Sequence, residues 1–283
     1  MQRSIALYIA ALLMLCFTKA NAATADRSFQ YNDTVRTYTL YIPDNATGPL
    51  PLIIHAHGYG SKTRQRADLN AAADRHGYAV CYPDGSPDTR GRLGWNVGYP
   101  SQHNMTVDEA DFLRALTADV AGNFNIDNSS VFLSGFSNGG DLCYQIAYTR
   151  PDMFRAYASV GGLTFTWMYL ANSLSSPVPF LEIHGTADKT SMWGGDPDNT
   201  GGWGAYLPVP MAVAAIACNN KCTAYFADRM SECVKTDRPV TCHRYTGNGP
   251  DVVLIQIDEG KHSWAAADID TGEIICRFFN KYR

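Results

Sequence analysis

The sequence lacks several features that would indicate other classes of protein. No apolar run is long enough to cross a bilayer, and 23 Lys and Arg against 27 Asp and Glu give a net charge of −4, with no basic excess for nucleic acid. Internal repeats and low-complexity linkers are also absent. We therefore expect neither a nucleic-acid-binding protein nor one that spans a membrane.

The N-terminal residues predict an exported chain. A basic start at Arg3 precedes a short apolar run over residues 5–17, and Ala20-Asn21-Ala22 forms a small-residue cleavage site. We expect a signal peptide over residues 1–22, cleaved after Ala22, and a secreted or periplasmic product. Residues 23–283 then suffice for a single α/β domain.

Alternating strand and helix patterns predict a three-layer α/β fold with a mainly parallel, doubly wound sheet and helices on both faces. An opening antiparallel pair is expected over residues 28–31 and 37–42. The expected core strands follow at residues 52–57, 79–82, 131–135, 157–160, 180–184 and 252–257. In such sheets ligands bind where loops leave the strand ends at one edge.

A Gly-x-Ser-x-Gly pentapeptide stands where a predicted strand turns into a helix. Gly135-Phe136-Ser137-Asn138-Gly139 follows apolar residues 131–133 and precedes a helix-like stretch over residues 141–149. In a nucleophile elbow the glycines allow a tight turn, and the strained serine projects its hydroxyl above the sheet. The pentapeptide alone is common by chance, so three further sequence features are needed to support it.

The first of these features is a strand that ends in the glycine-bounded loop His57-Gly58-Tyr59-Gly60. Acyl transfer builds negative charge on the carbonyl oxygen, and its usual donors are two backbone N–H groups, one after the nucleophile and one from such a loop. We expect the N–H groups of Tyr59 and Asn138 to form this oxyanion hole. The alternative is a metal pair at His55 and His57, but no cluster of carboxylates completes such a site.

The second feature is a carboxylate just beyond a predicted strand that breaks at Gly185. Asp188 is the expected acid of a triad, and it would hold an imidazole in the right tautomer. Asp196 and Asp198 are the alternatives, but they lie further from the strand end in a turn-rich stretch. His184 is expected to brace the acid loop.

The third feature is a histidine after the acid, because chains with this elbow run in the order Ser, Asp, His. Only His243 and His262 qualify. His243 adjoins a cysteine inside a cysteine-rich insertion, whereas His262 follows a predicted strand through a short turn. We therefore predict a triad of Ser137, Asp188 and His262.

Together these motifs resemble those of the secreted esterases related to polyhydroxybutyrate depolymerases, feruloyl esterases and acetylxylan esterases, many of them grouped as carbohydrate esterase family one. The resemblance covers nearly the whole mature chain. It implies an α/β-hydrolase fold and a serine carboxylesterase that needs no cofactor. It rests on His57-Gly58-Tyr59-Gly60, Gly135-Phe136-Ser137-Asn138-Gly139-Gly140, His184-Gly185-Thr186-Ala187-Asp188 and Gly260-Lys261-His262-Ser263-Trp264. The chain departs from the family pattern at Gly94 and at Met192-Trp193, so we expect the rim of its pocket to differ from that of the family.

Four of the eight cysteines lie between residues 218 and 242. In an exported chain, disulfides are favoured over a zinc site. The resemblance suggests a bridge between Cys218 and Cys242, which leaves Cys222 with Cys233 as an inner bridge. We expect no bound metal.

Aromatic residues near the predicted catalytic loops suggest the substrate. Trp95 and Trp264 are the candidates for substrate contact, because flat rings stack on phenolic rings or sugar faces. Core packing is the alternative for Trp95 and the preferred interpretation for Trp203. The predicted function is hydrolysis of feruloyl or acetyl esters on plant cell-wall polysaccharide fragments, with no nucleic-acid or membrane partner. The alternatives are a polyhydroxybutyrate-type depolymerase or peptidase with the same triad, and an inactive binding module.

Overall fold

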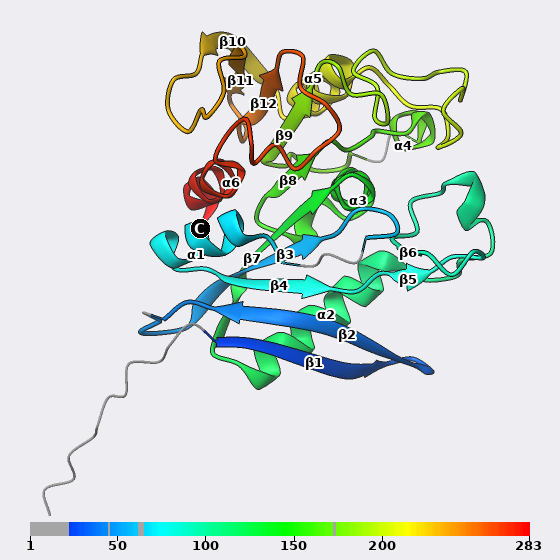
Figure 1. Cartoon of the computed structure of the whole chain (residues 1–283), viewed down its shortest axis with the longest axis vertical. Helices are drawn as coiled ribbons and strands as arrows, with labels where there is room; N and C mark the ends of the chain where they lie inside the picture. Colours follow the sequence, from blue (N-terminus) through cyan, green and yellow to red (C-terminus); the bar gives the residue numbers. More distant parts are fainter. Residues whose placement is uncertain (1–22, 45, 62–64, 172–173) are drawn as a thin grey trace, which may run out of the picture.

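A ten-stranded sheet forms the centre of the computed structural model, which describes residues 23–44, 46–61, 65–171 and 174–283 (Figure 1). Its strand order is β1-β2-β4-β3-β7-β8-β9-β12-β11-β10. The six strands from β4 to β12 in this order are mutually parallel, and the two strands at each end are antiparallel to their neighbours. The strands are β1 (Ala23–Tyr31), β2 (Thr34–Ile42), β3 (Leu50–Ala56), β4 (Ala79–Pro83), β7 (Ile126–Phe136), β8 (Tyr157–Val160), β9 (Phe180–Gly185), β10 (Cys222–Arg229), β11 (Val240–Gly247) and β12 (Val252–Ile257).

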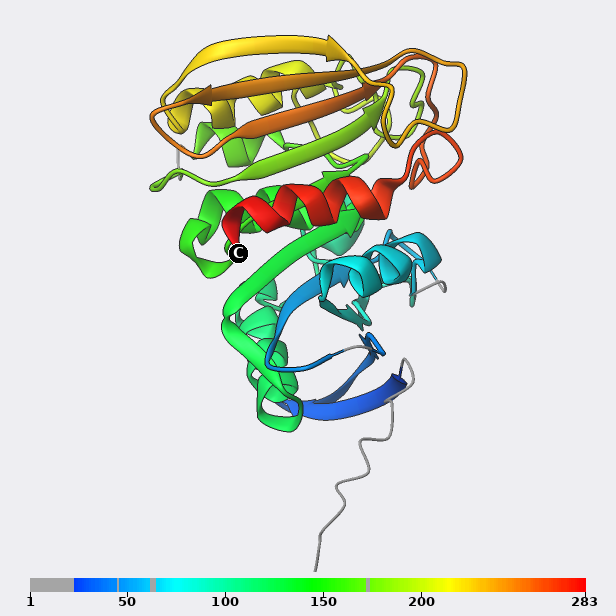
Figure 2. The same cartoon turned by 90° about the vertical axis from the view of Figure 1, so that its left-hand side faces the viewer.

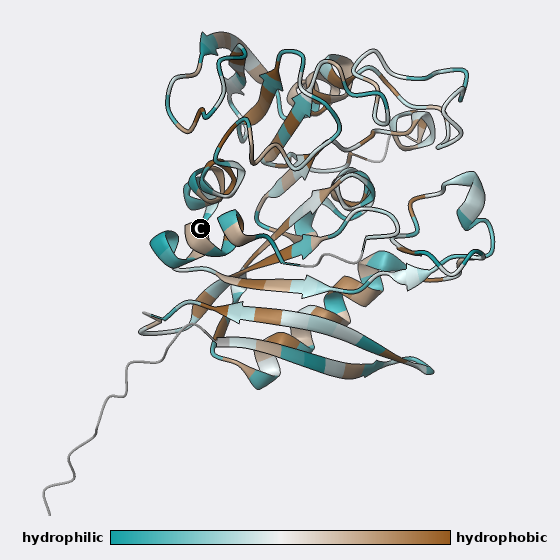
Figure 3. Ribbon diagram, viewed as in Figure 1, coloured by the Kyte–Doolittle hydropathy of each residue, from teal (hydrophilic) through white to brown (hydrophobic). Residues whose placement is uncertain are grey.

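Helices cover both faces of this sheet, as Figure 2 shows for the side that carries α1 (Ala67–His76) and α6 (Thr271–Phe279). The opposite face packs against α2 (Glu109–Asn123), α3 (Asn138–Thr149) and α5 (Val209–Asn219). A short pair, β5 (Ser86–Pro87) with β6 (Leu93–Gly94), and a short helix α4 (Thr166–Leu170) lie in the connections. The central strands are rich in apolar residues and are buried on both faces (Figure 3).

Local sequence explains where α2 begins and which side it buries. Asp108 caps the helix by accepting hydrogen bonds from the backbone N–H groups of Ala110 (2.9 Å) and Asp111 (3.2 Å). Acidic residues in the first turn favour the positive end of the helix dipole. An apolar stripe at helical spacing then faces the sheet, formed by Phe112, Leu113, Leu116 and Val120.

The predicted α/β-hydrolase fold is confirmed, and each expected core strand is present within a few residues of its predicted bounds. The expected opening pair is also present as β1 and β2, both longer than predicted. The cysteine-rich insertion after α5, which we expected to be held by disulfides, instead contains a hairpin of β10 and β11 that extends the sheet. The predicted signal peptide lies outside the described residues, among which no helix is long and apolar enough to cross a membrane.

The two predicted disulfides are wrong in this structure. All four cysteines of the hairpin region have free thiols. Cys218 lies in the last turn of α5 and Cys222 packs with that helix's face of the sheet, whereas Cys233 and Cys242 pack with the opposite face. Each predicted bridge would therefore join thiols that lie on opposite sides of the sheet. Spacing in the sequence carried no information on which face each thiol occupies.

Candidate active site

Ser137 stands alone between β7, which ends at Phe136, and α3, which begins at Asn138. Its backbone has φ 54° and ψ −120°, a conformation that side-chain-bearing residues rarely adopt. Two glycines make the turn possible. A Cβ at Gly135 would lie 2.0 Å from the carbonyl oxygen of Gly139, and one at Gly139 would lie 2.1 Å from that of Ala56.

A chain of hydrogen bonds joins the three residues of the predicted triad. The distance from Ser137 Oγ to His262 Nε2 is 2.9 Å, and that from His262 Nδ1 to Asp188 Oδ2 is 2.7 Å. The Asp188 side chain is only 1% exposed, whereas that of His262 is 19% exposed. The serine hydroxyl can thus donate to the imidazole, whose other nitrogen donates to a shielded carboxylate, as nucleophilic serine chemistry requires.

The acid loop holds Asp188 in place from several sides. Asp188 Oδ1 accepts hydrogen bonds from the backbone N–H groups of Thr190 and Ser191, both at 2.8 Å. His184 donates from Nε2 to the carbonyl oxygen of Ser191 (2.8 Å), which is the bracing contact expected from the sequence. The alternative acid, Asp196, instead accepts hydrogen bonds within its own turn over residues 196–201.

The hydrogen bonds of His57 set the orientation of the peptide group between Gly58 and Tyr59. His57 accepts a hydrogen bond from Gly85 N–H at Nε2 (2.9 Å), so Nδ1 carries the proton and donates to Gly58 O (2.7 Å). In a trans peptide the carbonyl and the following N–H point in opposite directions. The N–H of Tyr59 therefore points away from His57, and a Cβ added at Gly58 would lie 3.3 Å from the Cβ of Ser137.

Asn138 carries the N–H group that we predicted as the second donor of an oxyanion hole. It is the first residue of α3, and N–H groups in a first helical turn have no partner four residues back in the helix. Its side chain is fully buried and bonds both backbone groups of Trp95, from Trp95 N–H to Oδ1 (2.7 Å) and from Nδ2 to Trp95 O (3.1 Å).

The expected substrate contact of Trp95 is wrong, because its side chain is 0% exposed. The indole N–H donates to His57 O (2.8 Å), and the ring packs against Phe112 at a centroid distance of 6.1 Å. Trp95 thus joins the loop of Tyr59 to the start of α3. The position of Trp95 near the catalytic loops was compatible with substrate contact and with core packing. The packing of its side chain shows that it belongs to the core.

Trp264 also lies away from the reacting atoms, contrary to expectation. Its indole N–H donates to both carboxylate oxygens of Asp68 (2.8 and 3.0 Å), and the guanidinium of Arg66 lies 4.9 Å from the ring centroid. The ring packs edge-on against His55 at 4.8 Å, within the core beneath α1 and α6. Although Trp264 follows the base by two residues, its ring packs on the face of the sheet that α1 and α6 cover.

A cavity of about 380 Å³ opens above Ser137. Three aromatic rings form one wall, with centroid distances of 5.9 Å from Tyr59 to Tyr99 and to Trp203, and 5.1 Å from Tyr99 to Trp203. Trp203 packs against the core as expected, but it is only partly buried and also lines this cavity. The remaining lining comes from Gly58, Ser61, Phe136, Ser137, Leu163, Thr190, Ser191 and His262.

Asp141 of α3 holds two of these lining residues from below. Tyr99 donates its hydroxyl proton to Asp141 Oδ2, and Leu163 N–H donates to Asp141 Oδ1 (2.7 Å). Burial raises the pKa of Asp141 to about 8. Sequence reasoning missed Tyr99 and Asp141, and the one available signal was the position of Asp141 four residues after the serine, on the turn of helix behind the elbow.

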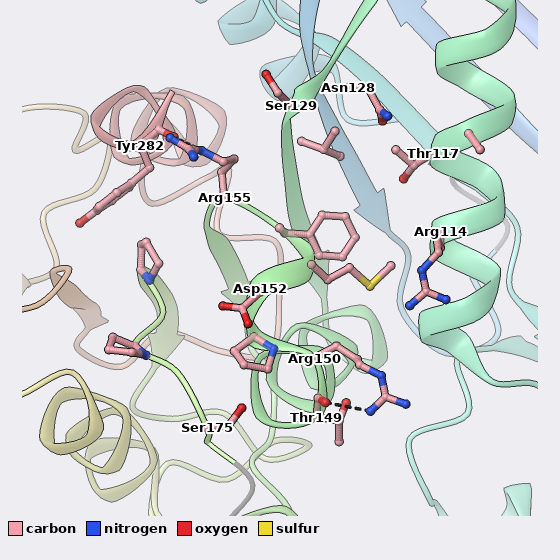
Figure 4. Close-up of a pocket in the computed structure, with 17 residues that line it drawn as sticks. Arg114, Thr117, Asn128, Ser129, Thr149, Arg150, Asp152, Arg155, Ser175 and Tyr282 are labelled. Carbon is pink, nitrogen blue, oxygen red and sulfur yellow. Dashed lines mark hydrogen bonds between the residues drawn. The ribbon is translucent and has the colours of Figure 1, made fainter.

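A larger surface hollow, of about 880 Å³, lies at the opposite edge of the sheet, near the starts of β8 and β9 (Figure 4). Figure 4 shows Arg114 and Arg150 on one side of it and Tyr282 on the other. The arginines contact neighbours of their own, such as Asp111 for Arg114 and the carbonyl of Thr149 for Arg150. The triad and the aromatic wall belong to the other edge, so the candidate active site is the smaller cavity.

The mostly parallel sheet, its two helical layers and the serine elbow at the carboxyl edge define an α/β-hydrolase. Comparison with known families agrees. The family described as Esterase PHB depolymerase matches residues 36–178, half of the 283-residue chain. The chain belongs to this esterase family.

Relatives of known name are esterases. The chain is 30% identical over 265 residues to the protein of Nocardia uniformis subsp. tsuyamanensis named "Putative esterase NocK", an alignment that covers 87% of this chain and 75% of the relative. It is 28% identical over 183 residues to feruloyl esterase B of Thermothelomyces thermophilus, covering 59% of this chain and 58% of that one. The chain thus spans just over half of the latter relative's length.

Solved structures share the fold at lower identity. An S-formylglutathione hydrolase from Agrobacterium tumefaciens superposes with a TM-score of 0.62 at 16% identity, covering 94% of this chain and 98% of the other. An acetyl xylan esterase from Aspergillus awamori gives 0.61 at 16% identity, covering 90% and 99%. At this identity the similarity establishes the fold alone.

Proposed function

We propose that this protein is a serine carboxylesterase that hydrolyses feruloyl or acetyl esters of plant polysaccharide through an acyl-enzyme. The observation that carries the proposal is the hydrogen-bonded series Ser137, His262 and Asp188 at the floor of an aromatic-walled cavity. Membership of an esterase family supports ester hydrolysis as the reaction class.

In the proposed mechanism Ser137 Oγ attacks the ester carbonyl while His262 Nε2 takes its proton. The oxyanion of the tetrahedral intermediate accepts hydrogen bonds from the N–H groups of Tyr59 and Asn138. His262 then gives the proton to the leaving alcohol, and the carbonyl re-forms as an ester of Ser137. A water molecule, deprotonated by His262, hydrolyses this ester and regenerates the serine.

The aromatic wall supports an acyl group that carries a ring. The rings of Tyr59, Tyr99 and Trp203 that line the cavity offer the edge-to-face and offset contacts that aromatic groups prefer. Feruloyl esterases among the relatives support the same choice. The name of the matched family favours a second candidate, a polyester of the polyhydroxybutyrate type, for the same triad.

The test is hydrolysis of methyl ferulate, acetylated xylan oligosaccharides and polyhydroxybutyrate by purified protein, with Ser137→Ala as the control. We expect release of ferulate or acetate and a loss of roughly a million-fold in rate for Ser137→Ala. Near-normal turnover by a folded Ser137→Ala variant would exclude a serine esterase. Degradation of the polyester alone would favour the second candidate.

We also propose that the chain is exported after removal of residues 1–22, because their sequence fits a signal peptide. N-terminal sequencing of the protein recovered from the medium or periplasm should begin at Ala23. Retention of residues 1–22 in the recovered protein would contradict export by this route.

A further inference from the structure

A second histidine and a second carboxylate lie directly behind the proposed triad. His184 and Glu182 are both on β9, two residues apart, so their side chains emerge on the same face of the strand. Both side chains are 0% exposed, and His184 Nδ1 lies 2.8 Å from Glu182 Oε1. The proposed reaction uses neither residue.

The hydrogen bonds fix the number of protons that this pair holds. His184 Nε2 faces the carbonyl oxygen of Ser191, which can only accept, so Nε2 carries a proton. A second proton lies between Nδ1 and Glu182. Glu182 Oε1 also accepts the N–H of Gly162 (3.3 Å), as a carboxylate oxygen does. This arrangement favours an imidazolium paired with a carboxylate.

The imidazole also lies beside the proposed catalytic acid. His184 Nε2 is 3.7 Å from Asp188 Oδ2, the same oxygen that accepts the hydrogen bond from His262. At 3.7 Å this is an electrostatic contact rather than a hydrogen bond. A positive charge there stabilises the buried carboxylate of Asp188, and the hydrogen bond to Ser191 fixes the loop that carries it.

We propose that His184, kept as a buried imidazolium by Glu182, is a positioning residue that maintains the charge and the orientation of Asp188. The proposal rests on the esterase function proposed above. Glu182 stabilises the proton on His184 Nδ1, and this proton stays between the two residues during turnover. It is not transferred to the substrate.

The surroundings of the pair agree with a retained proton. Burial by itself lowers the pKa of His184, but its contacts with Glu182 outweigh burial and raise that pKa above the ordinary value. Burial raises the pKa of Asp141, which lies on the helix behind the pair, whereas the charge of His184 acts to lower it. The groups that face the pair are Asp141, Cys143 and Tyr144 of α3, Ser159 of β8, and Asp188.

Glu182→Gln tests the charge with little change of shape. The amide can donate to a neutral Nδ1, so the hydrogen bond is preserved while the imidazolium loses its counter-ion. Loss of the positive charge lets the triad take up a proton more readily. We therefore expect the acid limb of kcat/KM against pH to move to higher pH by about half to one unit, with activity above that limb within about tenfold of wild type.

Glu273→Gln is the matched control. Glu273 lies on α6, away from the cavity, and it also pairs with a histidine, since His76 Nε2 is 3.1 Å from its Oε1. Its pH profile should coincide with that of the wild type. Coincident acid limbs for the wild type and an active Glu182→Gln variant would overturn the proposal, since a structural contact alone would leave them unmoved.

Nitrogen-15 NMR of histidine-labelled wild-type protein provides a second measurement that does not depend on activity or on variant folding. We expect His184, assigned by the loss of its signals in His184→Gln, to show two protonated ring nitrogens at pH 7 to 8. A neutral tautomer there would overturn the proposal. Failure of the esterase proposal is recognised separately, by retained turnover in Ser137→Ala.

Discussion

Asp188 and Asp196 lie on one loop but differ in what their carboxylates contact. Asp188 bonds His262, whereas Asp196 bonds backbone and side-chain groups of its own turn. We expect Asp188→Asn to lower kcat about ten-thousand-fold, because the amide favours the wrong tautomer of the imidazole. Asp196→Asn should stay within a few-fold of wild type. Steady-state kinetics on one ester substrate compares them, and a larger loss in Asp196→Asn would reassign the acid.

The aromatic wall gives a second comparison at the residue scale. Trp203→Ala should raise KM for feruloyl or other aryl esters about tenfold and for small acetyl esters much less, because it removes one ring of the cavity wall. Trp264→Ala should instead lower the free energy of unfolding by about 3 kcal/mol, since that ring is buried in the core. Equal effects of Trp203→Ala on both ester classes would contradict the assignment.

The sequence predicted that Ser137, Asp188 and His262 lie together, because each follows a strand whose end the topology brings to one edge. The aromatic contacts could not be predicted in the same way. Trp95 and Trp264 are close to the triad along the chain, yet their rings turn into the core. Tyr99 reaches the cavity from a connection far from the serine in sequence. Side-chain direction depends on packing of distant segments, which local motifs do not record.

At the scale of elements, the elbow depends on close contact between α3 and the end of β7. Gly135→Ala places a Cβ 2.0 Å from Gly139 O, so the turn must shift and activity should fall at least a hundredfold, with loss of stability. Gly122→Ala, in an exposed part of α2 with nothing within 4 Å, is the control and should stabilise by about 0.5 kcal/mol. Thermal unfolding and turnover measure both. An active Gly135→Ala protein would show that the contact is dispensable.

Glu273 joins helices α1 and α6 and gives a prediction of pH dependence. Burial would raise the pKa of Glu273, but hydrogen bonds from Arg277, Arg75 and His76 lower it to about 2. A depressed pKa contributes stability above the ordinary value of 4.5, and this contribution is lost as pH falls toward 2.

Glu273→Gln should therefore cost about 1–2 kcal/mol of unfolding free energy at pH 7, reduced from the full shift because both arginines are half exposed. The difference from wild type should shrink steadily below pH 4.5. Urea denaturation at several pH values measures it. A difference that is the same at pH 7 and pH 2.5 would show that the ionised form is not what stabilises the contact.

The hairpin of β10 and β11 shows why some elements escaped prediction. Its strands are mostly half-buried or exposed, so the apolar runs that revealed β3, β7 and β12 are missing. Tyr225 and Phe226 are adjacent and both about half exposed, at 54% and 50%, which weakens any alternation of apolar and polar residues. Its place at the sheet edge comes from pairing with β12, a contact that sequence patterns do not contain.

At the scale of the whole molecule, the alternation of strands and helices along the chain predicted the architecture well. Among the central parallel strands, β3, β4, β8 and β9 are buried throughout, and β7 is buried from Ser130 to Gly135. Continuous apolar runs of this kind are typical of parallel strands covered on both faces. The order of the strands in the sheet was harder to predict from the sequence, because it depends on which strands pair and not on the composition of any one strand.

The backbone of Ser137 has a consequence for the evolution of this chain. A residue with a side chain at φ 54° and ψ −120° costs about 1–3 kcal/mol, and glycine relieves much of that cost. We expect a Ser137→Gly protein to be inactive yet more resistant to heat and urea than the wild type. Reduced stability in Ser137→Gly would show that the turn is unstrained. If Ser137→Gly is instead the more stable protein, selection for catalysis has kept the wild-type fold less stable than a single substitution could make it.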